Sequence, residues 1–273
     1  MPKKYVIKFN GEEDPFSTEK VYQSALRVGA SRKLAEEISR KIEKQSYSGI
    51  KTSEIFNQVK KALHQEIPHS ALRFNLKKAI RKLGPTGFPF EKYIGEILLS
   101  QGYQVKINQN IPGFCCEYEI DFTAQKDSFV YIGECKYRNL FDGKVHSKDA
   151  LANYARFLDI SKGSFSKNSK LKSLLVTNTK FTSRAIAYSQ CVGVDLLGWK
   201  YPRDKGLEYL IEGQKLYPIT ILPDLNKYLA EVFVANGIML VKDLLDKDRI
   251  VKLTNLPEKK LNLLLKQAQL LLS

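Results

Sequence analysis

The sequence predicts a multidomain protein of 273 residues: a helical first part, an α/β second part with a mixed sheet, and a small all-α third part. Two breaks rich in glycine and proline, at residues 84–89 and 217–223, divide the chain. Apolar residues recur at helical spacing before the first break and after the second, whereas strands and helices alternate between them. We therefore expect domains over residues 1–84, 85–220 and 221–273.

The first part opens with a predicted strand at residues 5–9 and a turn at Asn10-Gly11. A helix should begin at Ser17-Thr18, because serine and threonine cap helix N-termini. Further helices are expected at 32–44, from Thr52 onward, and at 70–83. The last of these is strongly basic, with cations at Arg73, Lys77, Lys78, Arg81 and Lys82.

The second part reads as helix, three strands, helix, strand, helix, strand, an order typical of a mixed α/β sheet. Its helices are expected at 90–101, 147–160 and 183–191, and its strands at 103–107, 117–124, 129–134, 171–176 and 194–198. The tail should form helices at 224–236, 240–245 and 258–272, where leucines recur with helical spacing.

The formal net charge is +15, and it is concentrated in the first part. Residues 1–84 hold 18 Lys and Arg against 9 Asp and Glu, whereas residues 85–220 hold 18 against 14. Excess positive charge favours polyanions such as DNA. A solvated basic surface is the alternative. The middle part carries clustered acids, as expected of a metal site inside a basic protein.

Composition excludes several other classes of protein. The four cysteines (Cys115, Cys116, Cys135 and Cys191) form no CxxC pair, so buried reduced thiols are a better interpretation than a zinc site or a disulfide framework. No apolar run approaches the roughly 20 residues of a membrane span, and the charged start lacks the apolar block of a secretory signal. We expect a cytoplasmic protein with no membrane partner.

The residues best suited to catalysis lie on two expected strands. Glu134 and Lys136 alternate along one strand and therefore share a face. A hairpin turning near Lys126-Asp127 would set Asp121 opposite Glu134. Two carboxylates with an ammonium beside them can bind Mg²⁺, and Glu91 on the preceding helix could complete the site. The alternative is a surface ion pair.

The block EIDF at residues 119–122, with GECKYR at 133–138, resembles the PD-(D/E)xK nuclease superfamily, and more closely the Mrr-like restriction endonucleases. The resemblance covers about residues 86–200. It implies that Asp121 and Glu134 bind metal (Mg²⁺ or Mn²⁺), that Lys136 is the catalytic lysine, and that Glu91 is the helix glutamate. Glu117 and Glu119 share the expected face of Asp121, so one of them is a candidate extra ligand.

The first part resembles the ATP-cone domain over about residues 3–83, through Val6-Ile7-Lys8, Gly11, Phe16 and Lys20 and the later Ala71-Leu72-Arg73-Phe74. The resemblance implies binding of ATP or dATP as a regulator, with phosphate contacts from Lys8, Lys20 and Arg73. Phe9 and Phe74 replace the arginine and tyrosine usual there. A cone that serves as a basic docking module is the alternative.

The tail resembles a helix-hairpin-helix module, through residues 235–238 and 253–257. Such modules hold a DNA phosphate with backbone amides. Glu258-Lys259-Lys260 replaces the expected Gly-x-Gly, so Lys259 and Lys260 would act as point charges. A leucine-packed cap or a dimer surface is the alternative.

Together these patterns predict a Mg²⁺-dependent DNA endonuclease, with restriction, defence or repair as candidate roles and a nucleotide as candidate effector. Cutting both strands of a duplex ordinarily needs two sites, which makes a homodimer a candidate assembly. Two alternatives belong to another class: a non-catalytic nucleic-acid-binding protein on a nuclease fold, and a nucleotide-responsive regulator.

Overall fold

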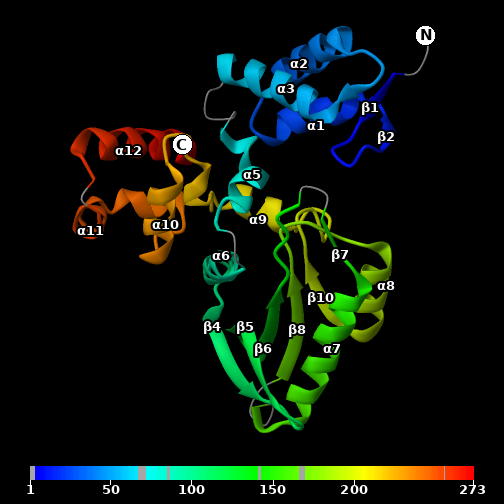
Figure 1. The fold of residues 1–273 in the computed structure, drawn as a ribbon, viewed down its shortest axis with the longest axis vertical. Helices are drawn as coiled ribbons and strands as arrows, with labels where there is room; N and C mark the ends of the chain where they lie inside the picture. The colour runs from blue at the N-terminus through cyan, green and yellow to red at the C-terminus, as the bar shows by residue number, and fades with distance from the viewer. Residues whose placement is uncertain (1–3, 67–71, 85–86, 141–142, 166–169, 255) are drawn as a thin grey trace.

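The computed structural model describes residues 4–66, 72–84, 87–140, 143–165, 170–254 and 256–273 (Figure 1). Ser70 and Ala71 of the expected basic helix, Pro85 and Thr86 of the first break, and Asn255 of the tail lie outside the described residues. None of the described helices is long and apolar enough to cross a membrane.

The N-terminal domain, expected to be helical apart from one strand at residues 5–9, contains a three-stranded sheet. Strands β1 (Tyr5–Ile7), β2 (Glu13–Pro15) and β3 (Ile50–Lys51) pair in the order β2-β1-β3. Helices α1 (Thr18–Arg27), α2 (Arg32–Gln45) and α3 (Thr52–Glu66) cover it, and Ser17 and Ser31 cap the first two through side-chain hydrogen bonds. Strand β1 lies within the strand expected at residues 5–9, whereas β2 and β3 were too short for a period of two to be visible in the sequence.

The expected basic helix is interrupted. The described part turns at Phe74 and Asn75 before helix α5 (Leu76–Arg81) begins, and the Asn75 amide donates to the Leu72 carbonyl. The Phe74 ring packs on Phe56 of α3, with ring centroids 4.4 Å apart. Tertiary packing of Phe74 against the cone therefore overrides the helical spacing.

The central domain is built on a five-stranded mixed sheet, in the order β10-β8-β6-β5-β4. Its strands are β4 (Gln104–Pro112), β5 (Glu117–Lys126), β6 (Phe129–Cys135), β8 (Lys170–Val176) and β10 (Val194–Leu197). Strands β4, β5 and β6 are antiparallel neighbours, and β6, β8 and β10 run parallel. All five strands were expected from sequence, although β4 extends five residues beyond Ile107.

Helices cover both faces of this sheet (Figure 1). Helix α6 (Phe88–Ser100) contacts β4 and β5, while α7 (Ser147–Lys162) and α8 (Ser183–Val192) pack on β8 and β10. The sequence patterns did not reveal the two-stranded sheet of β7 (Lys144–Val145) and β9 (Lys180–Phe181), nor helix α9 (Leu207–Gly213).

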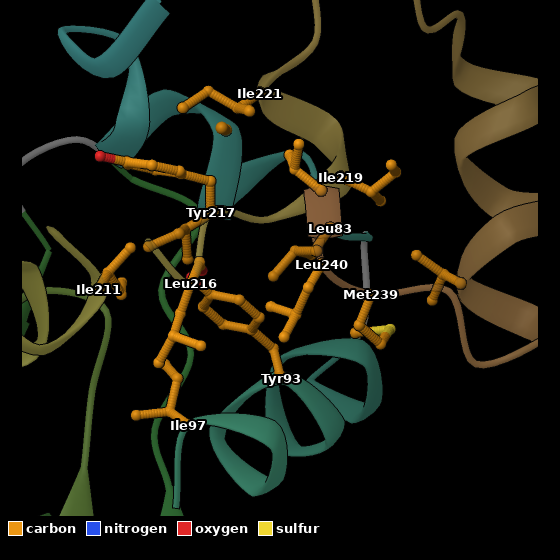
Figure 2. Packing of buried hydrophobic residues seen from close by; sticks show 14 of the residues in the cluster. Leu83, Tyr93, Ile97, Ile211, Leu216, Tyr217, Ile219, Ile221, Met239 and Leu240 are labelled. Atoms are coloured by element: carbon orange, nitrogen blue, oxygen red, sulfur yellow. The ribbon is translucent and has the colours of Figure 1, made fainter. Parts of the chain in front are cut away.

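The C-terminal module is all-helical over its described residues. It comprises η2 (Ile219–Ile221), α10 (Lys227–Ala235), η3 (Val241–Leu245), α11 (Lys247–Leu253) and α12 (Glu258–Leu272), of which α11 was not expected from sequence. Figure 2 shows Met239 and Leu240 beside Tyr93 of α6, and Tyr217 belongs to the same buried core. The Tyr93 hydroxyl donates to the Leu216 carbonyl at 2.7 Å.

The module shares one hydrophobic core with α5 and α6. The Thr220 hydroxyl donates to the Ala79 carbonyl of α5 at 2.7 Å, and Leu261, Leu264 and Leu271 of α12 are buried. This burial corresponds to the leucine-packed cap that was the alternative for the tail. The module therefore holds α5 and α6 in fixed positions beside the central sheet.

Candidate functional site

Asp121 and Glu134 lie side by side on neighbouring antiparallel strands. The paired register runs from Lys126–Phe129 to Phe122–Gly133, and Asp121 and Glu134 are the next residues of the two strands. The Cys135 amide donates to the Asp121 carboxylate at 2.6 Å. The structure thus brings the Asp121 carboxylate to the backbone of β6 next to Glu134.

The regular alternation of side chains between the two faces of the sheet is interrupted in β5 at Asp121. Phe122 belongs to the core under α6, whereas Ile120, two residues earlier, packs with Phe157 of α7. Residues two apart in a regular strand share a face, so the alternation breaks between them. Asn108, opposite Asp121 in the β4 register, has a φ of 54°, a left-handed conformation that asparagine tolerates. Asp121 therefore sits at a local distortion of the sheet.

Glu134 is 6% exposed, and cations engage both of its carboxylate oxygens. Lys136 Nζ donates to one oxygen at 2.5 Å, and the guanidinium of Arg156 donates to the other. The Arg156 guanidinium also lies 6.0 Å from the centre of the Tyr118 ring. A buried carboxylate needs such compensation, because burial of an unpaired charge is costly.

Sequence reasoning missed Arg156. It lies on α7 between the buried residues Asn153 and Ile160, at helical spacing from both. The sequence did contain a signal for this residue. Arg156 is a cation at a predicted buried position of the helix that follows the strand with Glu134.

Glu91 joins the same electrostatic cluster from α6. Burial, and then the charges of Asp121 and Glu134, raise the pKa of Glu91 to about 7. Burial and the charge of Glu134 raise the pKa of Asp121 to about 6, although the Cys135 amide opposes the shift. An added Cβ at Gly87 would lie 3.1 Å from a Glu91 oxygen, so glycine leaves room for this carboxylate. Glu117 and Glu119 are exposed on β5, and the charge of Glu119 also raises the pKa of Glu91.

The donor set fits a hard cation held by two protein ligands. Among the described residues, no group of three or more His, Cys, Asp or Glu is arranged to hold a metal. Magnesium is commonly bound through one or two carboxylates, with water and substrate phosphate completing its shell. Asp121 and Glu134 supply two such carboxylates, and burial, followed by the charge of Glu134, raises the pKa of Asp121.

A second candidate site lies in the N-terminal domain, where Lys8 and Lys20 converge. Their ammonium groups lie 3.5 Å and 3.2 Å from the same carboxylate oxygen of Asp14. A cavity of about 210 Å³ adjoins Lys20 and Asp14 and is lined by apolar side chains including Phe56 and Phe74. This arrangement offers an apolar slot beside two cations.

Arg73 is not brought to Lys8 and Lys20. Its guanidinium donates to the Leu271 carbonyl at 3.4 Å and lies 5.7 Å from the centre of the Tyr217 ring. The neighbouring Phe74 lines the cavity beside Lys20, whereas Arg73, expected to contact phosphate, does not. Arg73 thus contacts the C-terminal module.

Comparisons with known proteins find two sequence families. Residues 4–78 match the ATP cone domain, and residues 217–272 match the family described as AF1548-like, C-terminal. An uncharacterized protein of Archaeoglobus fulgidus is 38% identical over 152 residues, which are 55% of this chain and 82% of that protein. The crystal structure of the protein of unknown function AF1548 aligns with a TM-score of 0.58 and 32% identity, over 67% of this chain and 97% of that one.

These similarities confirm the ATP-cone domain expected from sequence. The tail resembles the AF1548-like family, and its likeness to a helix-hairpin-helix module stays a prediction. So does the nuclease likeness of the central domain.

Proposed function

Since this chain belongs to the same family as the Archaeoglobus fulgidus protein, we propose a function that rests on the geometry of its central sheet. The function is hydrolysis of DNA phosphodiester bonds by a metal-dependent endonuclease. The observation that carries it is the Asp121 carboxylate, which accepts from the Cys135 amide next to Glu134, with Lys136 Nζ 2.5 Å from the Glu134 carboxylate.

Each residue of the cluster has a role in this proposal. Asp121 and Glu134 would hold Mg²⁺ or Mn²⁺, which polarises a phosphoryl oxygen and lowers the pKa of a bound water. The Lys136 ammonium, 29% exposed, can donate to a phosphate oxygen and stabilise the charge that develops there. Arg156 orients the Glu134 carboxylate. Glu91, whose pKa responds to the charges of Asp121 and Glu134, would support the site from α6.

A non-catalytic role is the second candidate, and one observation favours it. Both oxygens of Glu134 are engaged by cations, which is also the arrangement of a structural ion cluster. In that case the protein would bind nucleic acid through its basic surface without cutting it.

A cleavage assay separates the two candidates. Supercoiled, linear and single-stranded DNA would be incubated with the protein, with and without Mg²⁺ or Mn²⁺. Metal-dependent cutting that chelation abolishes supports the nuclease. DNA binding with a steep salt dependence, and no cutting with either metal, would favour the non-catalytic role.

We also propose that the ATP-cone domain binds ATP or dATP as a regulator. The base would enter the apolar cavity lined by Phe56 and Phe74, and the phosphates would replace Asp14 beside Lys8 and Lys20. Competition between Asp14 and phosphate follows because both are anions that these two ammonium groups attract.

Calorimetric titration with ATP and dATP tests this assignment. Lys20→Ala should weaken nucleotide binding at least about tenfold, because it removes a charge-assisted contact. Asp14→Asn should strengthen binding, because the competing carboxylate is removed. Unchanged affinity in both variants would contradict the proposed phosphate position.

A further inference from the structure

Two adjoining cavities follow helix α5 between the ATP-cone domain and the C-terminal module. The first, of about 450 Å³, is lined by Lys60 of α3 and Lys78 of α5. The second, of about 340 Å³, extends to Asn139 after β6 and Lys227 of α10. Lys82 and Thr220 line both cavities, so the two adjoin, and together they are called the α5 groove. Figure 1 shows α5 between the two helical parts and directly above α6.

The α5 groove is strongly cationic. No acidic side chain lines the first cavity, and Glu231 is the one acid that lines the second. Among the described residues, no carboxylate lies within ion-pair distance of Lys60, Lys78 or Lys82. The Lys227 ammonium, by contrast, lies 3.9 Å from a carboxylate oxygen of Glu231. Uncompensated cations in a concave surface concentrate positive potential there.

The groove leads to the candidate catalytic residues. The Tyr137 hydroxyl bonds the carbonyls of Arg81 and Gly84 at 2.8 Å and 3.2 Å, which fixes the end of α5 beside the residue that follows Lys136. Asn139, on the groove wall, is three residues from Lys136 and hence at most about 11 Å away along the backbone. At a rise of about 3.4 Å per base pair, this separation corresponds to about three base pairs.

We propose that the α5 groove binds the phosphate backbone of DNA and leads it to the Asp121–Glu134 site. That the groove leads DNA to an active site rests on the proposed function, but DNA binding in the groove does not depend on catalysis. Lys78 and Lys82 lie four residues apart, on one exposed side of α5 and its C-terminal cap, so both ammonium groups can reach one strand. A flat anionic membrane surface fits less well, because the cations line a concave groove.

Charge reversal tests the groove against a matched control. The variant Lys78→Glu with Lys82→Glu would be compared with Lys33→Glu plus Lys44→Glu, two exposed lysines of α2 whose reversal changes the net charge equally. Binding of a labelled DNA duplex would be followed by fluorescence anisotropy, in EDTA and in an Asp121→Asn background. Cleavage then plays no part, so a failed nuclease proposal leaves this measurement intact.

The groove variant should bind DNA at least about tenfold more weakly, and the slope of log K against log salt should fall by about 2, whereas the control should change less than about twofold. Equal losses in both pairs would overturn the proposal. The proposal would also be overturned if the groove variant bound DNA as well as the parent protein but no longer bound phosphatidylserine vesicles.

Lysine acetylation of the unmutated protein provides a second readout, in case the groove variant does not fold. DNA should protect Lys78 and Lys82 from the reagent more than Lys33 and Lys44. Equal protection of the two pairs would contradict a DNA-binding groove along α5.

Discussion

Arg27, the last residue of α1, places its Nε 3.3 Å from a carboxylate oxygen of Glu208 in α9. This ion pair joins the ATP-cone domain to the central domain. Glu208 is 13% exposed, and Lys200 lies 3.8 Å from its other oxygen. Helix α1 also carries Lys20, so one rigid element extends from the proposed phosphate site to the domain contact.

The Arg27–Glu208 pair should stabilise the contact between the domains. A double-mutant cycle with Arg27→Gln and Glu208→Gln should give a coupling energy of about 1 kcal/mol, because Glu208 is largely shielded from water. The exposed pair Arg40–Glu36 is the control and should give less than about 0.5 kcal/mol. Urea unfolding of the four proteins measures both. Equal coupling in the two pairs would contradict a shielded interdomain contact.

Glu212 should make stability fall as pH rises. Burial raises its pKa above the ordinary 4.5, although the Tyr217 hydroxyl bonds its carboxylate at 2.8 Å. The folded state then holds a proton that the unfolded state releases, so stability is lost between the ordinary pKa and the raised one. Glu212→Gln keeps an acceptor for Tyr217 and removes the charge. Its advantage over the parent protein should grow from about pH 4 to pH 8.

The exposed Glu231→Gln variant is the control for this pH series, measured by urea unfolding. It should follow the parent protein at each pH. If the stability of Glu212→Gln also follows the parent protein, the buried carboxyl does not contribute as described.

Gly133 should not tolerate a side chain. A Cβ at this position would lie 2.1 Å from the Phe122 ring, inside the core next to Glu134. Gly133→Ala should therefore destabilise the protein by roughly 2–4 kcal/mol, since overpacking forces ring and strand apart. Gly213→Ala is the control, because a Cβ there meets nothing within 4 Å. Thermal unfolding distinguishes them, and a similar loss in both would contradict the packing argument.

Long periodic elements of the fold could be predicted from the sequence. The hairpin spacing around Lys126-Asp127 was enough to predict the pairing of β5 with β6 up to Phe122 and Gly133, because an antiparallel register is fixed once its turn is known. Short elements such as β7, β9 and α11 carry too few residues for a period to emerge.

Contacts between distant elements could not be predicted. Arg156 reaches Glu134 only through the packing of α7 on the sheet, and Arg73 reaches Tyr217 only through the docking of the C-terminal module. Neither contact has a signature in local spacing. For the same reason the α5 groove, which three separate parts of the chain line, was visible in the sequence only as an excess of positive charge.

Single-turnover cleavage of a labelled duplex in Mg²⁺ tests the central claim most directly, with Asp121→Asn compared against Asp127→Asn. Asp127 lies at the turn of the same hairpin, with a φ of 52° that asparagine also accepts. We predict that Asp121→Asn lowers the rate at least about 100-fold, while Asp127→Asn stays within about twofold of the parent protein. Two results would contradict a nuclease centred on Asp121, Glu134 and Lys136. One is cleavage by Asp121→Asn at the parent rate, and the other is a parent protein that does not cleave DNA.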